Sequence, residues 1–80
     1  MPRFFFNMRE SSGLTRDPEG AELPDIEAAR HAAVDRAFAI WSKDPPDPAH
    51  NDDTFEVADE TGQTVLLVSF SEAFAERAAT

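Results

Sequence analysis

The chain of 80 residues contains no cysteine, and this absence excludes several kinds of chemistry. Disulfide bonds, thiolate catalysis and cysteine-ligated zinc or iron–sulfur centres all require that residue. A small domain without disulfides fits a reducing compartment.

Long apolar runs are also lacking: Phe4–Phe6 is soon followed by Asn7, Arg9 and Glu10, too early for a signal peptide. No segment approaches the roughly 18 apolar residues of a membrane span. We therefore expect a soluble, cytoplasmic protein.

Basic residues are scarce. Seven Lys and Arg stand against sixteen Asp and Glu, which gives a formal net charge of −9, and Lys43 is the only lysine. Proteins that bind nucleic acid usually need a basic footprint that neutralises phosphates. An anionic membrane surface repels an acidic chain for the same electrostatic reason. We expect neither nucleic acid nor a membrane as a partner, and the acidity either keeps the protein in solution or attracts a basic protein.

Motifs for catalysis and cofactor binding are missing as well. The three glycines stand apart, so there is no glycine-rich phosphate loop, and no serine lies in a nucleophile-elbow motif. His31 shares a helix face with Glu27 and Asp35, which we interpret as a solvated polar face. His50 lies in an Asp-rich segment, interpreted as an acidic loop with no more than incidental cation binding. The sequence predicts no enzyme, no cofactor, no metal site and no small-molecule substrate.

What the sequence does contain is an ordered series of strand, turn and helix signals. The aromatic segment Arg3–Arg9 is typical of a strand, with Phe4, Phe6 and Met8 on the face that we expect in the core. A turn over 10–13 and a short second strand over 14–16 follow. The next four residues, Asp-Pro-Glu-Gly at 17–20, fit a type I turn.

A single alanine-rich helix is predicted from an N-cap at Asp25 to about Ser42. With about 100° between successive residues, its apolar side chains gather on one face. These predicted core residues are Ile26, Ala29, Ala33, Val34, Ala37, Ile40 and Trp41. Phe38 lies at the border of this stripe, where it would cover a rim or contact a partner.

The second half of the chain predicts a hairpin and a tail. Residues 43–53 are rich in Pro and Asp, which favours a long mobile loop. Strands over 54–58 and 64–70 flank a hairpin loop that contains Gly62. The segment 71–80 is a tail that could form a short helix with Ser71 as its N-cap. We therefore predict one α+β domain over 1–80, in ββαββ order, whose antiparallel sheet of about four strands has one helix packed on one face.

The last predicted strand is apolar on both of its faces. Val65 and Leu67 point one way, and Leu66, Val68 and Phe70 point the other way. Strands of this kind are usually covered on both sides, whereas a single central helix covers one. The second face, which also carries Phe5, could be covered by the tail around Phe74, by a second copy of the chain or by a different protein.

These patterns together predict a non-enzymatic protein–protein interaction module or a homodimer. The predicted interface consists of Arg3, Phe5, Arg9, Val65, Leu67 and Phe74, with the two arginines as a polar rim. The alternative is an antitoxin-like or regulatory protein that binds a basic protein partner through its acidic surface.

Three segments carry a family resemblance that spans residues 1 to about 70. They are the opening Met-Pro-Arg-Phe-Phe-Phe, then Glu-Gly-Ala-Glu-Leu-Pro-Asp at 19–25, then Phe-Glu-Val-Ala-Asp-Glu at 55–60. The chain resembles a family of short proteins of unknown function that is common in rhizobia and related alphaproteobacteria. Asn7 stands where that family commonly has His, and Ser11 where it has Gly. The resemblance supports the fold and implies no activity; the ββαββ order also resembles antitoxin domains of the HicB type, at the level of fold alone.

Overall fold

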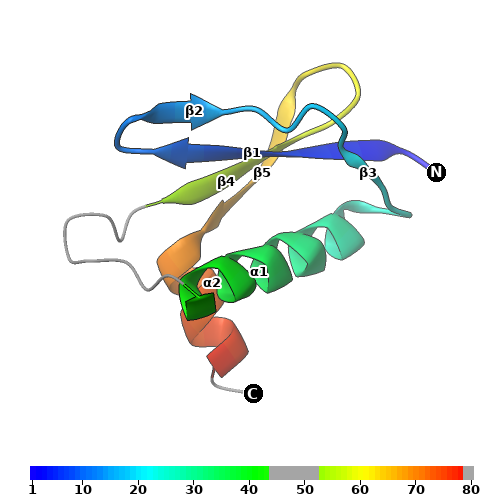
Figure 1. Cartoon of the computed structure of the whole chain (residues 1–80). Coiled ribbons are helices and arrows are strands. Elements are labelled where there is room, and N and C mark those ends of the chain that lie inside the picture. The colour runs from blue at the N-terminus through cyan, green and yellow to red at the C-terminus, as the bar shows by residue number, and fades with distance from the viewer. Residues whose placement is uncertain (44–52, 79–80) are drawn as a thin grey trace.

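The computed structural model describes residues 1–43 and 53–78, which form an antiparallel sheet with two helices on one side of it (Figure 1). The elements are β1 (Arg3–Glu10), β2 (Gly13–Thr15), β3 (Ala21–Glu22), α1 (Ile26–Lys43), β4 (Thr54–Ala58), β5 (Thr64–Ser69) and α2 (Phe70–Ala78). The predicted α+β class, the long helix and the short C-terminal helix are confirmed. Apart from its first and last residues, the predicted loop 43–53 lies outside the described residues. None of the described helices is long and apolar enough to cross a membrane.

The sheet has the order β2-β1-β4-β5. Strand β2 pairs with the end of β1, and β3 pairs with its beginning. The sequence did not predict β3. It forms because the turn over 17–20 returns the chain to β1, where Glu22 pairs with Arg3 and Ala21 with Phe4. Strand β5 pairs with β4 and ends the sheet. Its register shifts near Thr64, so that Val65 is an extra residue at a bulge.

The core lies between the sheet and α1. The buried strand side chains on this face are Phe4, Phe6, Phe55, Val57 and Val68, and Met8 and Leu66 pack against them partly buried. On α1 the residues Ala29, Ala33 and Ala37 are fully buried. Alanine is small enough to let a helix approach a sheet closely, so these positions set the line of contact. Larger side chains close the end of the core near α2, where Trp41 packs against Phe70 with ring centroids 5.8 Å apart.

Helix α1 begins where the sequence predicts, but the apolar face predicted for it is buried only in the middle of the helix. The Oδ1 atom of Asp25 accepts a hydrogen bond of 2.8 Å from the amide of Ala28, which confirms the N-cap. Ile26 and Ile40 were predicted in the core, and this is wrong: they are 48% and 39% exposed. A helix of 18 residues is about 27 Å long, longer than four strands are wide. Ile26 lies in the first turn, and Ile40 lines an open recess of about 430 Å³ between α1, β1 and β2.

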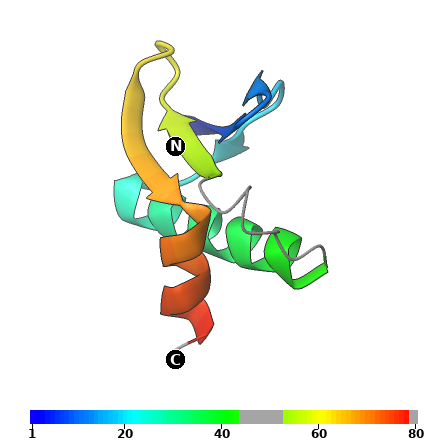
Figure 2. The ribbon, with the colours of Figure 1, turned by 90° about the vertical axis from the view of Figure 1, so that its left-hand side faces the viewer.

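Helix α2 begins two residues earlier than the predicted cap allows. The Oγ atom of Ser69, rather than that of Ser71, accepts a hydrogen bond of 3.1 Å from the amide of Glu72 and caps the helix. Because the chain turns directly from β5 into α2, Phe70 belongs to the helix and not to the strand. Phe74 then stacks on Phe38 of α1 with ring centroids 5.0 Å apart. The tail therefore packs on the α1 side of the molecule (Figure 2).

Candidate interaction surface

The sheet has a second face, opposite α1, which we call the open face because neither described helix lies on it (Figures 1 and 2). The strand register defines its side chains. Asn7 pairs with Glu56, which in turn pairs with Leu67 on β5. Paired residues of antiparallel strands project to the same side of a sheet. Asn7, Glu56 and Leu67 therefore form one row across the open face, and Arg9 and Thr54 belong to the next row.

Leu67 is the apolar feature of the open face. Its exposed fraction is 67%, exceeded among the large apolar residues described only by the 77% of Met1. It borders a shallow hollow of about 350 Å³. The other residues of this hollow are Arg9, Glu10, Ser11, Thr54 and Glu56. The structure thus places Arg9 and Leu67, two of the predicted interface residues, around the same depression.

A charged pair, Arg9 and Glu56, lines that hollow. Arg9 donates hydrogen bonds from its guanidinium to the carboxylate of Glu56 on the neighbouring strand. The hydrogen bond from Arg9 lowers the pKa of Glu56, with a smaller opposing effect of desolvation, and the same bond raises the pKa of Arg9. Glu56 was not among the predicted interface residues. It holds the Arg9 head against the sheet, so that the two charges form a neutral polar border beside Leu67.

Phe5 lies at the other end of the open face and is half-buried. The turn over 17–20 covers it: a Cβ atom on Gly20 would come within 2.9 Å of the Phe5 ring and of the Phe4 carbonyl oxygen. Gly20 also has a φ of +70°, a backbone conformation that side chains other than hydrogen disfavour. Part of the Phe5 ring is therefore covered by the chain's own backbone.

The turn that covers Phe5 is held by Asp17. Its carboxylate accepts hydrogen bonds from the amides of Phe6, Glu19 and Gly20, at 3.1, 3.2 and 3.2 Å. In return, the amide of Asp17 donates a hydrogen bond of 2.9 Å to the Oδ1 atom of Asn7, whose side chain is buried. The sequence predicted the turn but not its attachment to β1. The available signal was a polar residue, Asn7, in the middle of an aromatic strand.

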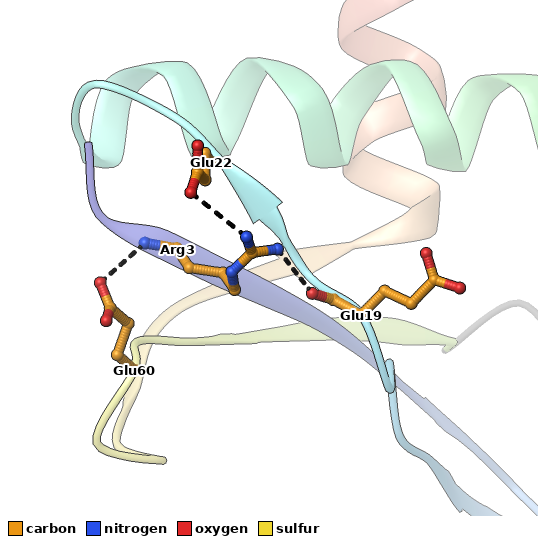
Figure 3. A network of polar contacts seen from close by, with 4 residues as sticks. All are labelled: Arg3, Glu19, Glu22 and Glu60. Atoms are coloured by element: carbon orange, nitrogen blue, oxygen red, sulfur yellow. Dashed lines mark hydrogen bonds and ion pairs between the residues drawn. The ribbon is translucent and has the colours of Figure 1, made fainter.

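Arg3 serves three connections at the start of β1 (Figure 3). Its Nη1 atom donates to the carbonyl oxygen of Glu19 at 2.8 Å, and its Nη2 atom donates to Glu22 at 3.2 Å. Its backbone amide donates to the carboxylate of Glu60 at 3.0 Å. Arg3 thus joins β1 to β3 and to the β4–β5 hairpin.

The remaining predicted interface residues also separate in space. Val65 is half-buried at the bulge of β5, where it packs against the core. Phe74 lies on the opposite side of the sheet, between α2 and α1, where its ring is also 5.9 Å from that of Trp41. The structure brings Arg9 and Leu67 to one hollow. It places Val65 beside Thr64, toward the Phe5 end of the sheet, because the register pairs Phe5 with Ala58 and Ala58 with Thr64. Arg3 lies at the start of β1, and Phe74 lies on the α1 side of the sheet.

Strand β5 is also the edge of the sheet, a feature that the sequence did not predict because strand order cannot be deduced from local patterns. Strand β5 is the last strand in the order β2-β1-β4-β5, and among the described residues no strand pairs with the side of β5 that faces away from β4. The segment 61–71, which contains β5, has no Asp, Glu, Lys or Arg and is the longest such segment of the chain. An uncharged open edge therefore adjoins the exposed Leu67.

Side chains that bind metals gather nowhere in the described part of the chain: no three His, Cys, Asp or Glu residues there are placed to hold an ion. His31 is exposed on α1 and borders a hollow of about 320 Å³ with Asp35 and Arg77. The Asp-rich segment around His50 lies outside the described residues.

The fold and this surface define a small α+β domain with two helices on one side of its sheet and an open face and an open edge on the other. The chain belongs to the family described as Domain of unknown function (DUF6894), whose model matches residues 3–71. Neither a search of curated proteins nor a search of solved structures returned a match.

Proposed function

We propose that this protein is a non-enzymatic, cytoplasmic interaction module that binds protein through the open face around Leu67. The exposure of Leu67 carries the proposal. A single exposed leucine is common on protein surfaces. This one lies on a face that neither described helix covers, beside a strand edge without charges. Apolar groups concentrated at such a place, with a polar border, favour contact with another protein.

The roles of the residues follow from their positions. Leu67 is the apolar anchor of this surface. The Arg9–Glu56 pair is the polar rim, already neutralised within the molecule. Binding energy in protein interfaces concentrates in a few well-buried side chains, with rim contacts contributing little. The proposal therefore assigns most of the affinity to Leu67.

The test compares two aspartate variants of exposed apolar residues. Leu67→Asp places a charge on the open face, and the control Ile26→Asp places one on α1, on the other side of the sheet. Both should keep the far-UV circular dichroism of the wild type, since both side chains are exposed. Leu67→Asp should lose the association of the wild type, measured as the solution mass by light scattering and as proteins retained in a pull-down. Equal behaviour of the two variants would contradict the proposal.

A second candidate rests on the acidic surface, which would bind a basic protein in the manner of an antitoxin. The observation that favours it is the group of carboxylates around Arg3. Glu22 and Glu60 contact Arg3, whereas Glu19 contacts it through its carbonyl oxygen and turns its carboxylate away (Figure 3). Of these three glutamates, Glu22 forms the ion pair with the Arg3 guanidinium, and the carboxylate of Glu19 points away from it. A basic partner held in this way should co-purify at low salt and dissociate at high salt.

A further inference from the structure

We propose that the partner is a second copy of this chain, and that the two β5 strands pair antiparallel to form one continuous sheet through both molecules. The inference rests on the proposed function and names the partner and the mode of contact. It is carried by three observations: the open edge of β5, the absence of charge along it, and the position of Leu67.

The edge itself has the groups that pairing needs. A terminal strand presents backbone N–H and C=O groups on its free side, and another strand satisfies them. Proteins usually protect such edges with charged side chains, with proline or with a bulge. Strand β5 has neither charge nor proline, and its bulge at Val65 leaves Leu66–Ser69 in regular register. At the opposite end of the sheet, β2 pairs with only three residues of β1.

Charge decides in favour of a second copy over a basic partner at this place. Two molecules that each carry a net charge of −9 repel one another, so they should meet where charge is lowest. The uncharged segment 61–71 provides that place. Beside it, Arg30 is paired with Glu76 through contacts of 3.0 and 3.1 Å, which reduces the charge at the rim. Glu72 and Glu76 of α2 border a hollow with Leu67, but β5 itself offers no carboxylate to a basic partner.

The geometry of the sheet restricts the register of this pairing. A two-fold axis perpendicular to the sheet keeps both α1 helices on the same side, and facing residues must then project to the same face. Leu67 can therefore face its own copy, with Leu66 opposite Val68 of the second copy and Val65 opposite Ser69. This register brings the two Leu67 side chains, the most exposed apolar ones of the sheet, into contact with each other. Self-pairing also needs no second kind of protein.

The first experiment uses the absence of cysteine from the chain. A Leu67→Cys variant has a single thiol, and facing residues in an antiparallel pair have Cα atoms about 4.5–5.5 Å apart, within the range for a disulfide. Mild oxidation should give a species of twice the 8.8 kDa chain mass that disappears on reduction. The control is Thr64→Cys, also exposed on β5. In the proposed register it lies about 20 Å from its own copy, so it should crosslink at least tenfold more slowly.

The second experiment tests the same contact by complementary charge. Leu67→Lys and Leu67→Glu should each be monomeric, because each variant places like charges opposite one another. An equimolar mixture of the two should form a heterodimer, seen as a doubled mass by light scattering. This readout does not depend on oxidation, and the two substituted side chains lie at a position exposed enough to leave the fold intact.

The outcomes separate this inference from the proposed function. A wild type that stays at 8.8 kDa into the millimolar range overturns self-pairing, and so does faster crosslinking of Thr64→Cys than of Leu67→Cys. If the wild type is monomeric and Leu67→Asp still loses a bound protein that Ile26→Asp retains, the open face binds a different protein. If Leu67→Asp changes neither mass nor capture, both proposals fail.

Discussion

At the scale of single residues, Asp17 does more for this fold than its place in a turn suggests. Its carboxylate accepts hydrogen bonds from the amides of Glu19 and Gly20, which close the turn, and from the amide of Phe6, which belongs to β1. Partial burial raises the pKa of Asp17, but the three amides and the nearby Arg36 outweigh it and hold the pKa below its ordinary value. The charged form is therefore the one that the folded state favours.

Replacing this carboxylate should weaken the fold in a pH-dependent way. Asp17→Ala removes the three contacts, and we expect it to lower the free energy of unfolding by about 1–2 kcal/mol, a reduced value because the side chain is only half-buried. Since the folded pKa is lowered, this stabilisation is present above the unfolded pKa of about 3.9 and is lost as the pH falls through the folded pKa. Urea unfolding at neutral and acidic pH measures both effects.

The control for that experiment is Asp17→Asn. It keeps a carbonyl oxygen as an acceptor but cannot titrate, so its loss of stability relative to the wild type should shrink as the pH falls below about 4. A difference between Asp17→Asn and the wild type that stays constant down to pH 2 would show that the carboxylate charge is not involved.

At the scale of the elements, the junction between β5 and α2 is the point where strand becomes helix without a loop. The amide of Phe70 donates a hydrogen bond of 2.8 Å to the carbonyl oxygen of Asp53, which extends the hairpin, while the Phe70 side chain is fully buried. Ser69 accepts from the amide of Glu72 and starts the helix at the same position. Strand end, helix start and core contact thus coincide within two residues.

The two serines at this junction allow a direct test of which one caps α2. Ser69→Ala should cost about 1 kcal/mol, the usual loss for a helix N-cap. Ser71→Ala loses only the contact of 3.0 Å between the two hydroxyl groups, both near the surface, and should change stability by less than half as much. Thermal unfolding followed by circular dichroism compares them. Equal losses would mean that the hydroxyl pair, rather than the cap, carries the effect.

These elements also show what local sequence can and cannot predict. The strand over 54–58 and the Asp25 cap follow from alternation and capping chemistry, which act within a few residues, and the structure confirms both. Strand β3 and the exposure of Ile40 depend on how far α1 extends and where the chain returns to β1. Those are distances between elements, and periodicity along the chain contains no information about them.

At the scale of the whole molecule, local patterns predicted interface residues that are exposed on a strand, but not which of them lie close together. The sequence identified Leu67 and Arg9, which the register of β1, β4 and β5 brings to one hollow. It also named Phe74, which α2 places on the opposite side of the sheet. The face of a strand follows from alternation, whereas strand order, and with it the open edge of β5, depends on pairings far apart in the chain.

The net charge of the molecule provides a last prediction, which separates the two candidate functions. If two copies pair along β5, each brings a charge of −9 toward the other, so the dimer opposes a long-range repulsion. Screening at about 0.5 M salt, where the Debye length falls to a few Å, should strengthen self-association several-fold over that at about 0.01 M. A contact between the acidic surface and a basic protein should weaken over the same range. Light scattering across a salt series measures the sign of this dependence. Because the paired strands themselves carry no charge, an association that weakens as salt rises would locate the contact on the carboxylates instead of on β5.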